Sequence, residues 1–208
     1  LHKSYSYDNL VTDSAAGATA FACGKKTYNG AIAVDPDTSA LKRILEEAEV
    51  RRLATGLVAT CSITHATPAS FIAHAPQRKQ YEKIATFFLE TEVDYFVGGG
   101  KKFFDRRETD DRNLYAELEN KGYEISDYFK SDFEKVAIDS KKNFGYFTAD
   151  EEPLPKAQGR DYLVPAVKEA MKFLDKHDEA NKGFFLMIEG AQIDWGGHAN
   201  NSEYIISE

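Results

Sequence analysis

Short, strongly apolar runs separated by amphipathic segments constrain the fold of this 208-residue chain more than any other feature. The runs lie at 54–63, 93–100 and 183–190. Continuous apolar runs of this length are typical of strands covered on both faces, which occur mainly in parallel sheets. Their alternation with helical segments predicts an α/β fold, a layered α/β/α sandwich around a mostly parallel central sheet.

The segments between these runs show the periodicity of amphipathic helices. Residues 38–53 repeat apolar side chains on one face behind a hydroxyl cap at position 38 or 39, and residues 80–92 repeat the pattern. Two further helices are expected. One ends at Gly122, and the other has Pro165 in its first turn, where a missing amide hydrogen does no harm.

A chain of this length suits one hydrophobic core, so residues 1–208 are predicted to form a single, partial domain. The stretch at about 123–160 is aromatic and charged and has no long periodic segment, which predicts an insertion lying over one end of the sheet. The first residues carry neither an initiator Met nor a signal-peptide pattern, and the last lack a helix-ending Gly or Pro. We therefore expect an internal fragment of a longer protein.

Composition excludes some function classes. The net charge of -8, with dispersed Lys and Arg, argues against a nucleic-acid partner, because phosphate backbones are bound by clustered basic residues. No apolar run is long enough to span a membrane. Cys23 and Cys61 are too few for a disulfide framework, and both are expected to be unpaired.

The segment VTDSAAGATAFACGKKTYNGAIAVD, residues 11–35, places Ser14 where a helix can begin and Gly24 where it can end. Its small face (Ala15, Ala18, Ala22) predicts a close approach of this helix to the sheet. Ser14 has two interpretations, a helix N-cap or a nucleophile beside a phosphate group held by free backbone amides. Spacing alone does not decide between them.

Four blocks, in order, resemble the alkaline phosphatase family. They are DSAAGATA followed by GKKTYNGAIAVD, then THATPASFIAHAPQRKQY, VGGGKKFF and FFLMIEGAQIDWGGHANN. The resemblance implies a hydrolase that cleaves phosphate monoesters through a phosphoserine at Ser14, with inorganic phosphate as product, two zinc ions and one magnesium ion. It also implies a periplasmic or secreted protein that forms a homodimer at full length.

The same resemblance assigns roles to residues of this sequence. Asp194 and His198 match two ligands of one zinc ion, and Ser14 is the other zinc ion's ligand in this chain. Glu189 and Thr67 match magnesium ligands. Such cations would offset the negative charge that repels nucleophiles from a phosphate monoester.

Arg78 matches the guanidinium that grips two phosphate oxygens in a fork, and Asp13 is expected to support Arg78 electrostatically. Two positions depart from the best-known bacterial pattern. His65 stands where that pattern has an aspartate near magnesium, which puts the third metal in doubt because histidine prefers zinc and softer ions. Trp195 stands where the pattern has a lysine, which predicts weaker binding of phosphate.

The family's remaining zinc ligands have no counterpart in this sequence. Because zinc normally takes at least three protein ligands, the isolated fragment is expected to bind catalytic zinc poorly and to be inactive. A parallel sheet cut at both sequence ends leaves apolar edges or faces uncovered, and is expected to favour self-association or partial disorder. Two alternatives stay open, a sulfatase or phosphodiesterase relative and a noncatalytic binding or scaffold lobe.

Overall fold

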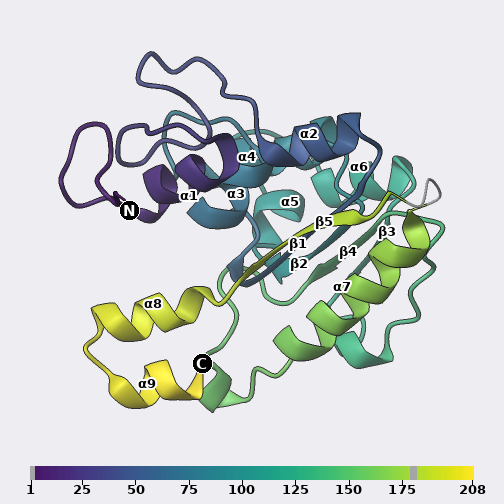
Figure 1. The fold of residues 1–208 in the computed structure, drawn as a ribbon. Coiled ribbons are helices and arrows are strands. Elements are labelled where there is room, and N and C mark those ends of the chain that lie inside the picture. The colour runs from purple at the N-terminus through teal and green to yellow at the C-terminus, as the bar shows by residue number, and fades with distance from the viewer. Residues whose placement is uncertain (1–2, 179–181) are drawn as a thin grey trace.

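A computed structural model describes residues 3–178 and 182–208 as three layers, with helices on both faces of one five-stranded sheet (Figure 1). The strand order is β3-β4-β2-β1-β5, and every pairing is parallel. The predicted α/β/α sandwich is therefore confirmed. The strands are β1 (Ala54–Ser62), β2 (Tyr95–Gly99), β3 (Glu124–Asp127), β4 (Phe144–Phe147) and β5 (Phe184–Glu189).

The three apolar runs form strands as expected, and they occupy the side of the sheet that carries the candidate site. All nine residues of β1 are buried, because β1 pairs with β2 on one side and with β5 on the other and is covered by helices on both faces. The register places Ala59 opposite Glu189, so the carboxyl ends of β1 and β5 lie side by side. Polar groups that follow these strands are thereby brought to one edge of the sheet.

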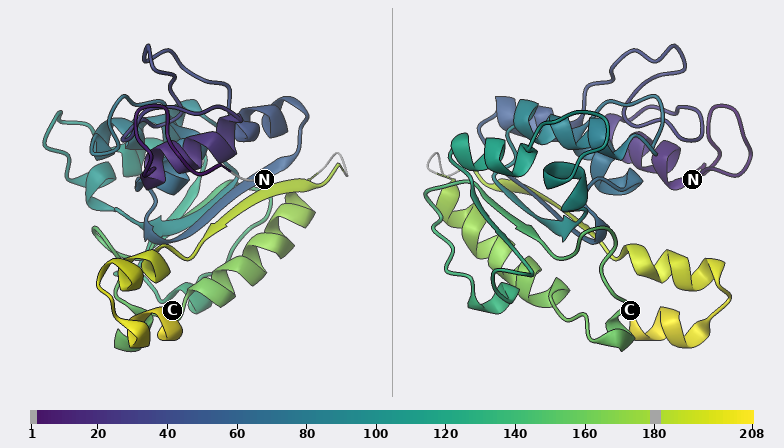
Figure 2. Two further views of the ribbon diagram at one scale, coloured as in Figure 1. Left: turned by 60° about the vertical axis from the view of Figure 1, so that its left-hand side comes forward. Right: turned by 180° about the vertical axis from the view of Figure 1, so that it is seen from behind.

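The helices divide between the two faces of the sheet. Figures 1 and 2 show α1 to α6 on one face, α7 on the other, and the pair α8 and α9 beyond the carboxyl end of β5. The bounds are α1 (Ser14–Cys23), α2 (Ile44–Val50), α3 (Ala66–Ile72), α4 (Tyr81–Glu90), α5 (Lys102–Asp105), α6 (Leu114–Asn120), α7 (Leu163–His177), α8 (Ala191–His198) and α9 (Ser202–Ser207). Short 3-10 turns lie at Phe133–Lys135 and Lys156–Gln158. No helix of the described ranges has the length and apolar character of a membrane span.

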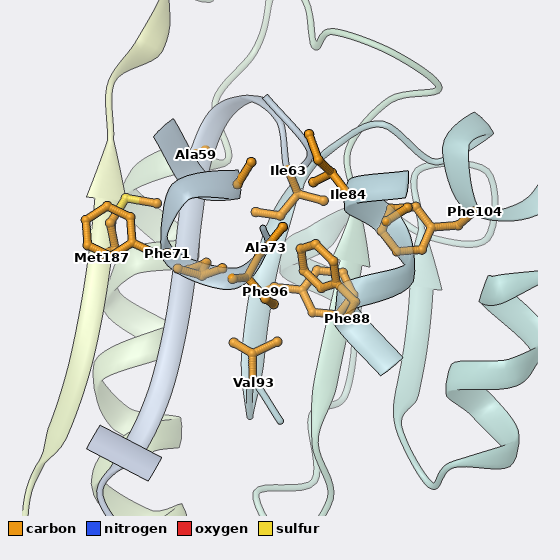
Figure 3. Close-up of a cluster of buried hydrophobic side chains, with 14 of the residues drawn as sticks. Ala59, Ile63, Phe71, Ala73, Ile84, Phe88, Val93, Phe96, Phe104 and Met187 are labelled. Carbon is orange, nitrogen blue, oxygen red and sulfur yellow. The ribbon is translucent and has the colours of Figure 1, made fainter. Parts of the chain in front are cut away.

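Two hydrophobic cores hold the layers together. In the core under α3 and α4, Phe88 meets Phe96 and Phe104 in edge-on contacts with ring centres 5.0 and 5.4 Å apart (Figure 3). In the core under α7, Phe173 packs on Tyr95 of β2. These contacts place the apolar faces of α4 and α7 on opposite sides of the sheet.

Several expectations need correction. The helix expected over 38–53 is only α2, because Asp35 accepts hydrogen bonds from the amides of 37 and 39 and Thr38 adopts a left-handed φ of 65°, which makes a turn there. The small face of α1 packs against α3 rather than directly on the sheet. Residues 123–160 supply the edge strand β3 and its neighbour β4, which extend the sheet instead of lying over its end. Whether this stretch is an insertion stays a prediction.

Candidate active site

A cavity of about 620 Å³ gathers residues from five separate segments of the chain. It is formed by the loop before α1 with the first residue of α1, the loop after α1, the start of α3, the loop before α4, and α8. Six of the site residues expected from the sequence line it, together with Trp195: Asp13, Ser14, His65, Arg78, Asp194 and His198. Glu189 and Thr67 lie together outside this lining.

Ser14 is the first residue of α1, and Asp13 is the residue that caps the helix. The Asp13 backbone is extended, and its Oδ1 accepts a hydrogen bond from Ala16 N at 2.9 Å. The N-cap interpretation of Ser14 is therefore wrong, because an aspartate already fills that role. The Ser14 hydroxyl is left at the positive end of a ten-residue helix, on the wall of the cavity.

Asp13 also fixes the position of Arg78. Its Oδ2 accepts from Arg78 Nη1 at 3.0 Å and from Gly30 N at 3.1 Å, while Arg78 N donates to Gly30 O at 2.7 Å. The two charged side chains are only 23% and 25% exposed. One edge of the guanidinium is held in this way, and its fork stays beside Ser14 on the cavity wall, where it can bind an anion.

Asn29 is a positioning residue that the sequence analysis missed. Its Oδ1 accepts from Asp13 N at 3.0 Å, and its side-chain amide donates to Val11 O at 2.9 Å. Gly30 follows with a φ of 93°, which a residue with a side chain rarely adopts. The Asn-Gly pair at 29–30 was a turn signal that could have located this residue.

His65 stands at the N-cap position of α3, and burial together with the nearby Arg78 charge lowers its pKa to about 4. Its Nε2 lies 3.2 Å from Arg78 Nη2, and its ring meets Trp195 edge-on with centres 6.1 Å apart. A neutral ring that accepts from Arg78 at Nε2 carries its proton on Nδ1. Within the described ranges that buried Nδ1 has no hydrogen-bond partner. The ring therefore retains an unused polar atom.

Asp194 and His198 lie one turn apart on α8, with Asp194 Oδ2 3.4 Å from His198 Nε2. The spacing of four residues puts both side chains on one face of this helix. Both side chains are well exposed, at 65% and 81%. They are therefore accessible as donors to an ion at the cavity mouth.

Glu189, Thr67 and Cys61 form a second polar group at the carboxyl ends of β1 and β5. The Thr67 hydroxyl hydrogen-bonds the Glu189 carboxylate, and Cys61 Sγ donates to Glu189 Oε2 at 3.3 Å. Burial raises the pKa of Glu189, although these hydrogen bonds and the Arg78 charge oppose the shift. Cys61 was expected only to be unpaired, and both cysteines are free thiols.

The candidate ligands match the preferences of magnesium and zinc to different extents. Glu189 and Thr67 offer the oxygen ligands that magnesium prefers, and His65 adds a nitrogen with affinity for zinc. Asp194 and His198 suit zinc, but they are two ligands where zinc takes at least three. Among residues 3–178 and 182–208, no group of three or more His, Cys, Asp or Glu side chains is arranged to hold an ion.

Comparisons with known proteins point to one family along the whole chain. The family model described as alkaline phosphatase matches residues 1–208. Alkaline phosphatase 4 and alkaline phosphatase 3 of Bacillus subtilis are 40% and 44% identical over 97% and 95% of this chain. The alkaline phosphatase of the Antarctic bacterium TAB5 is 46% identical and superposes with a TM-score of 0.90 over 99% of this chain.

The matched relatives are longer than this chain. It spans 43% of each of the two Bacillus enzymes and 59% of the TAB5 structure. A histidine-to-aspartate mutant of the TAB5 enzyme is described with Mg bound in its M3 site. Within that span, the family match, the identities and the superposition agree, and the chain belongs to the alkaline phosphatase family.

Proposed function

We propose that the full-length protein hydrolyses phosphate monoesters through a phosphoserine intermediate on Ser14. The observation that carries this proposal is the convergence of Ser14, Arg78 and the pair Asp194 and His198 on one cavity. The three features come from segments far apart in the sequence. A nucleophile, an anion-binding fork and metal donors together suit phosphoryl transfer.

In the proposed reaction, Ser14 Oγ forms a bond to phosphorus as the ester oxygen leaves, and water then cleaves the phosphoserine to release inorganic phosphate. Arg78 binds two nonbridging oxygens of the phosphoryl group through the guanidinium N–H groups that Asp13 and His65 do not use. Asp13 holds one edge of the guanidinium and keeps the fork in place. The first-turn amides of α1 add favourable dipoles for the same anion.

We propose two zinc ions and one magnesium ion as cofactors. Ser14 would bind one zinc ion, and Asp194 and His198 the other, with further ligands from parts of the protein outside this chain. Glu189, Thr67 and His65 would form the third site, where zinc is the alternative occupant because of the imidazole. When bound, these cations supply positive charge to the entering and leaving oxygens and lower the pKa of water.

Four further properties are proposed, one for the isolated chain and three for the whole protein. Because Asp194 and His198 leave a zinc site short of a ligand, the isolated chain should be inactive. Trp195 lines the cavity without a charge, so phosphate should bind more weakly than beside a lysine. A periplasmic or secreted location and a homodimeric state are proposed from the family relation alone.

The test is replacement of Ser14 by Ala in the full-length protein. A labelled monoester should phosphorylate the unmodified protein when the reaction is quenched in acid, and Ser14→Ala should give no adduct. Ser39→Ala is the matched control, because Ser39 lies exposed in the turn before α2. Removal of metal with a chelator should abolish turnover in the unmodified protein. A labelled adduct that persists in Ser14→Ala would refute the assignment of the nucleophile.

A further inference from the structure

The loop formed by residues 149–153 is built against the carboxyl ends of the strands. Lys101 N donates to Ala149 O at 3.1 Å and Lys102 N to Asp150 O at 3.0 Å, and the buried side chain of Gln192 donates to Pro153 O at 2.8 Å. The same loop presses on the end of β2. A Cβ on Gly99 would lie 2.1 Å from the Glu151 carbonyl oxygen, so only glycine permits this approach.

Because the backbone of residues 149–153 is held in this way, the carboxylate of Glu152 faces the end of β1. Glu152 Oε2 accepts from Ser62 N at 2.6 Å, across 90 residues of sequence. Part of Glu152 is exposed, but its carboxylate is turned inward toward the Ser62 amide. Charge-assisted hydrogen bonds to backbone amides are among the stronger ones in proteins. Glu152 therefore fixes the position at which β1 ends.

The turn that follows carries two proposed ligands of the third metal site. Ser62 Oγ lies 2.8 Å from Thr64 Oγ1, and His65 N donates to Ser62 O at 2.9 Å. His65 is the N-cap of α3, and Thr67 follows in its first turn and bonds Glu189. A continuous chain of hydrogen bonds thus leads from Glu152 through Ser62 to His65, and the start of α3 sets where Thr67 meets Glu189.

The charge of Glu152 also bears on that site. Burial raises the pKa of Glu152 against the Ser62 hydrogen bond, and the negative charges of Glu151 and Glu189 raise it further. Glu152 and Glu189 both act electrostatically on the Cys61 thiol, which lies near the end of β1 and bonds Glu189. Two carboxylates that repel each other at one strand edge favour a divalent cation between or beside them.

We propose that Glu152 is a positioning residue for the third metal site, an inference that rests on the proposed function. Glu152 holds the turn that presents His65 and Thr67, and it adds a negative charge that strengthens cation binding beside Glu189. Groups that orient metal ligands from outside the coordination shell commonly change metal affinity by about 10- to 100-fold when they are removed. Glu152 belongs to the stretch in which the sequence showed no site signal.

The experiment is titration of Mg²⁺ into the full-length, zinc-loaded protein by calorimetry. Glu152→Gln keeps an acceptor for Ser62 N but removes the charge, and should weaken Mg²⁺ binding about tenfold. Glu152→Asp keeps the charge and should recover part of that loss. Glu151→Gln is the matched control. It removes the same charge from the neighbouring residue, which pairs with Lys102 and is exposed, and it should leave Mg²⁺ binding unchanged.

Mg²⁺ affinity of Glu152→Gln within about threefold of the unmodified protein would overturn the inference. Glu189→Gln separates this failure from failure of the proposed site. If Glu189→Gln loses Mg²⁺ while Glu152→Gln does not, only the role of Glu152 is wrong. If neither variant changes Mg²⁺ binding, the third site itself is wrong. If the variants do not fold, hydrogen exchange in the unmodified protein still tests the hydrogen bond between Glu152 and the Ser62 amide. A rapidly exchanging Ser62 amide would contradict that hydrogen bond.

Discussion

Replacement of Asp13 by Ala should both destabilise the protein and loosen its anion-binding fork. The Asp13 carboxylate accepts three hydrogen bonds, from Ala16 N at 2.9 Å, from Arg78 Nη1 at 3.0 Å and from Gly30 N at 3.1 Å. One substitution removes the cap of α1, the partner of a guanidinium and the acceptor for a turn amide. The effect therefore combines local helix stability with the geometry of the site.

The magnitude follows from these three contacts. Loss of a helix cap costs about 1 kcal/mol. The Arg78 pair is about a quarter exposed, so solvent screening limits its contribution to about 1 kcal/mol. The Gly30 amide contributes a similar amount at most. Because all three contacts share one carboxylate, they are not independent, and we expect a total loss of about 2 to 3 kcal/mol in the free energy of unfolding.

The assay is urea unfolding of the full-length protein, followed by circular dichroism, with inhibition by inorganic phosphate measured in parallel. Asp13→Asn is the matched variant, because asparagine caps a helix as well as aspartate but carries no charge for Arg78. It should lose about 1 kcal/mol less than Asp13→Ala. Both variants should bind phosphate more weakly than the unmodified protein, since each releases the guanidinium.

Equal stability of Asp13→Ala and Asp13→Asn would refute the assignment of Asp13 as the cap. A stability of Asp13→Ala within about 0.5 kcal/mol of the unmodified protein would refute the whole calculation. If phosphate binding were unchanged in both variants, Asp13 would not hold Arg78 in its binding position. The two measurements thus separate the structural role of the carboxylate from its role at the site.

Three further predictions concern the core, the pH dependence and the cavity. Leu57→Ala on fully buried β1 should cost about 2 to 5 kcal/mol in urea unfolding, whereas Leu10→Ala at an exposed position should cost less than about 0.5 kcal/mol. Burial raises the pKa of Glu49 from 4.5 to about 7. The folded protein therefore binds this proton more tightly than the unfolded chain. The protonated carboxyl contributes stability on the order of 1 kcal/mol after solvent screening. This stability is present below pH 4.5 and is lost as the pH rises to about 7. Denaturation at several pH values should show this slope, and Glu49→Gln should remove it. Trp195→Lys should tighten inhibition by phosphate by about 1 kcal/mol, roughly fivefold, and an unchanged inhibition constant would contradict the predicted effect of the missing charge.

The main elements could be predicted from the sequence because their patterns are local. The run at 54–63 is apolar at nearly every position, which is what a central strand covered on both faces requires, and it forms β1. Gly24 ends α1 in a left-handed conformation with φ 68°, as its place after a small-residue helix indicated. The motif blocks likewise located most of the residues that line the cavity.

The two shortest strands and the true start of α2 depend on contacts between side chains and segments that no local sequence pattern contains. The strands β3 and β4 have four residues each and exist because they pair with one another and with β2, so their sequence carries too little periodicity to be recognised. The helix expected from position 38 begins at Ile44, because the Asp35 side chain captures amides of the preceding turn. Side-chain competition of this kind is invisible in an apolar pattern.

Apolar periodicity and motif spacing act within one segment, so they were enough to predict the layers, the central strands and the candidate site residues. The folded structure was needed to show that Asp13 rather than Ser14 caps α1, that Asp13 pairs with Arg78 across 65 residues, and that Glu152 reaches the end of β1. These relations depend on how distant segments meet at the carboxyl edge of a parallel sheet. Such meetings are set by packing and register, which are properties of the whole fold.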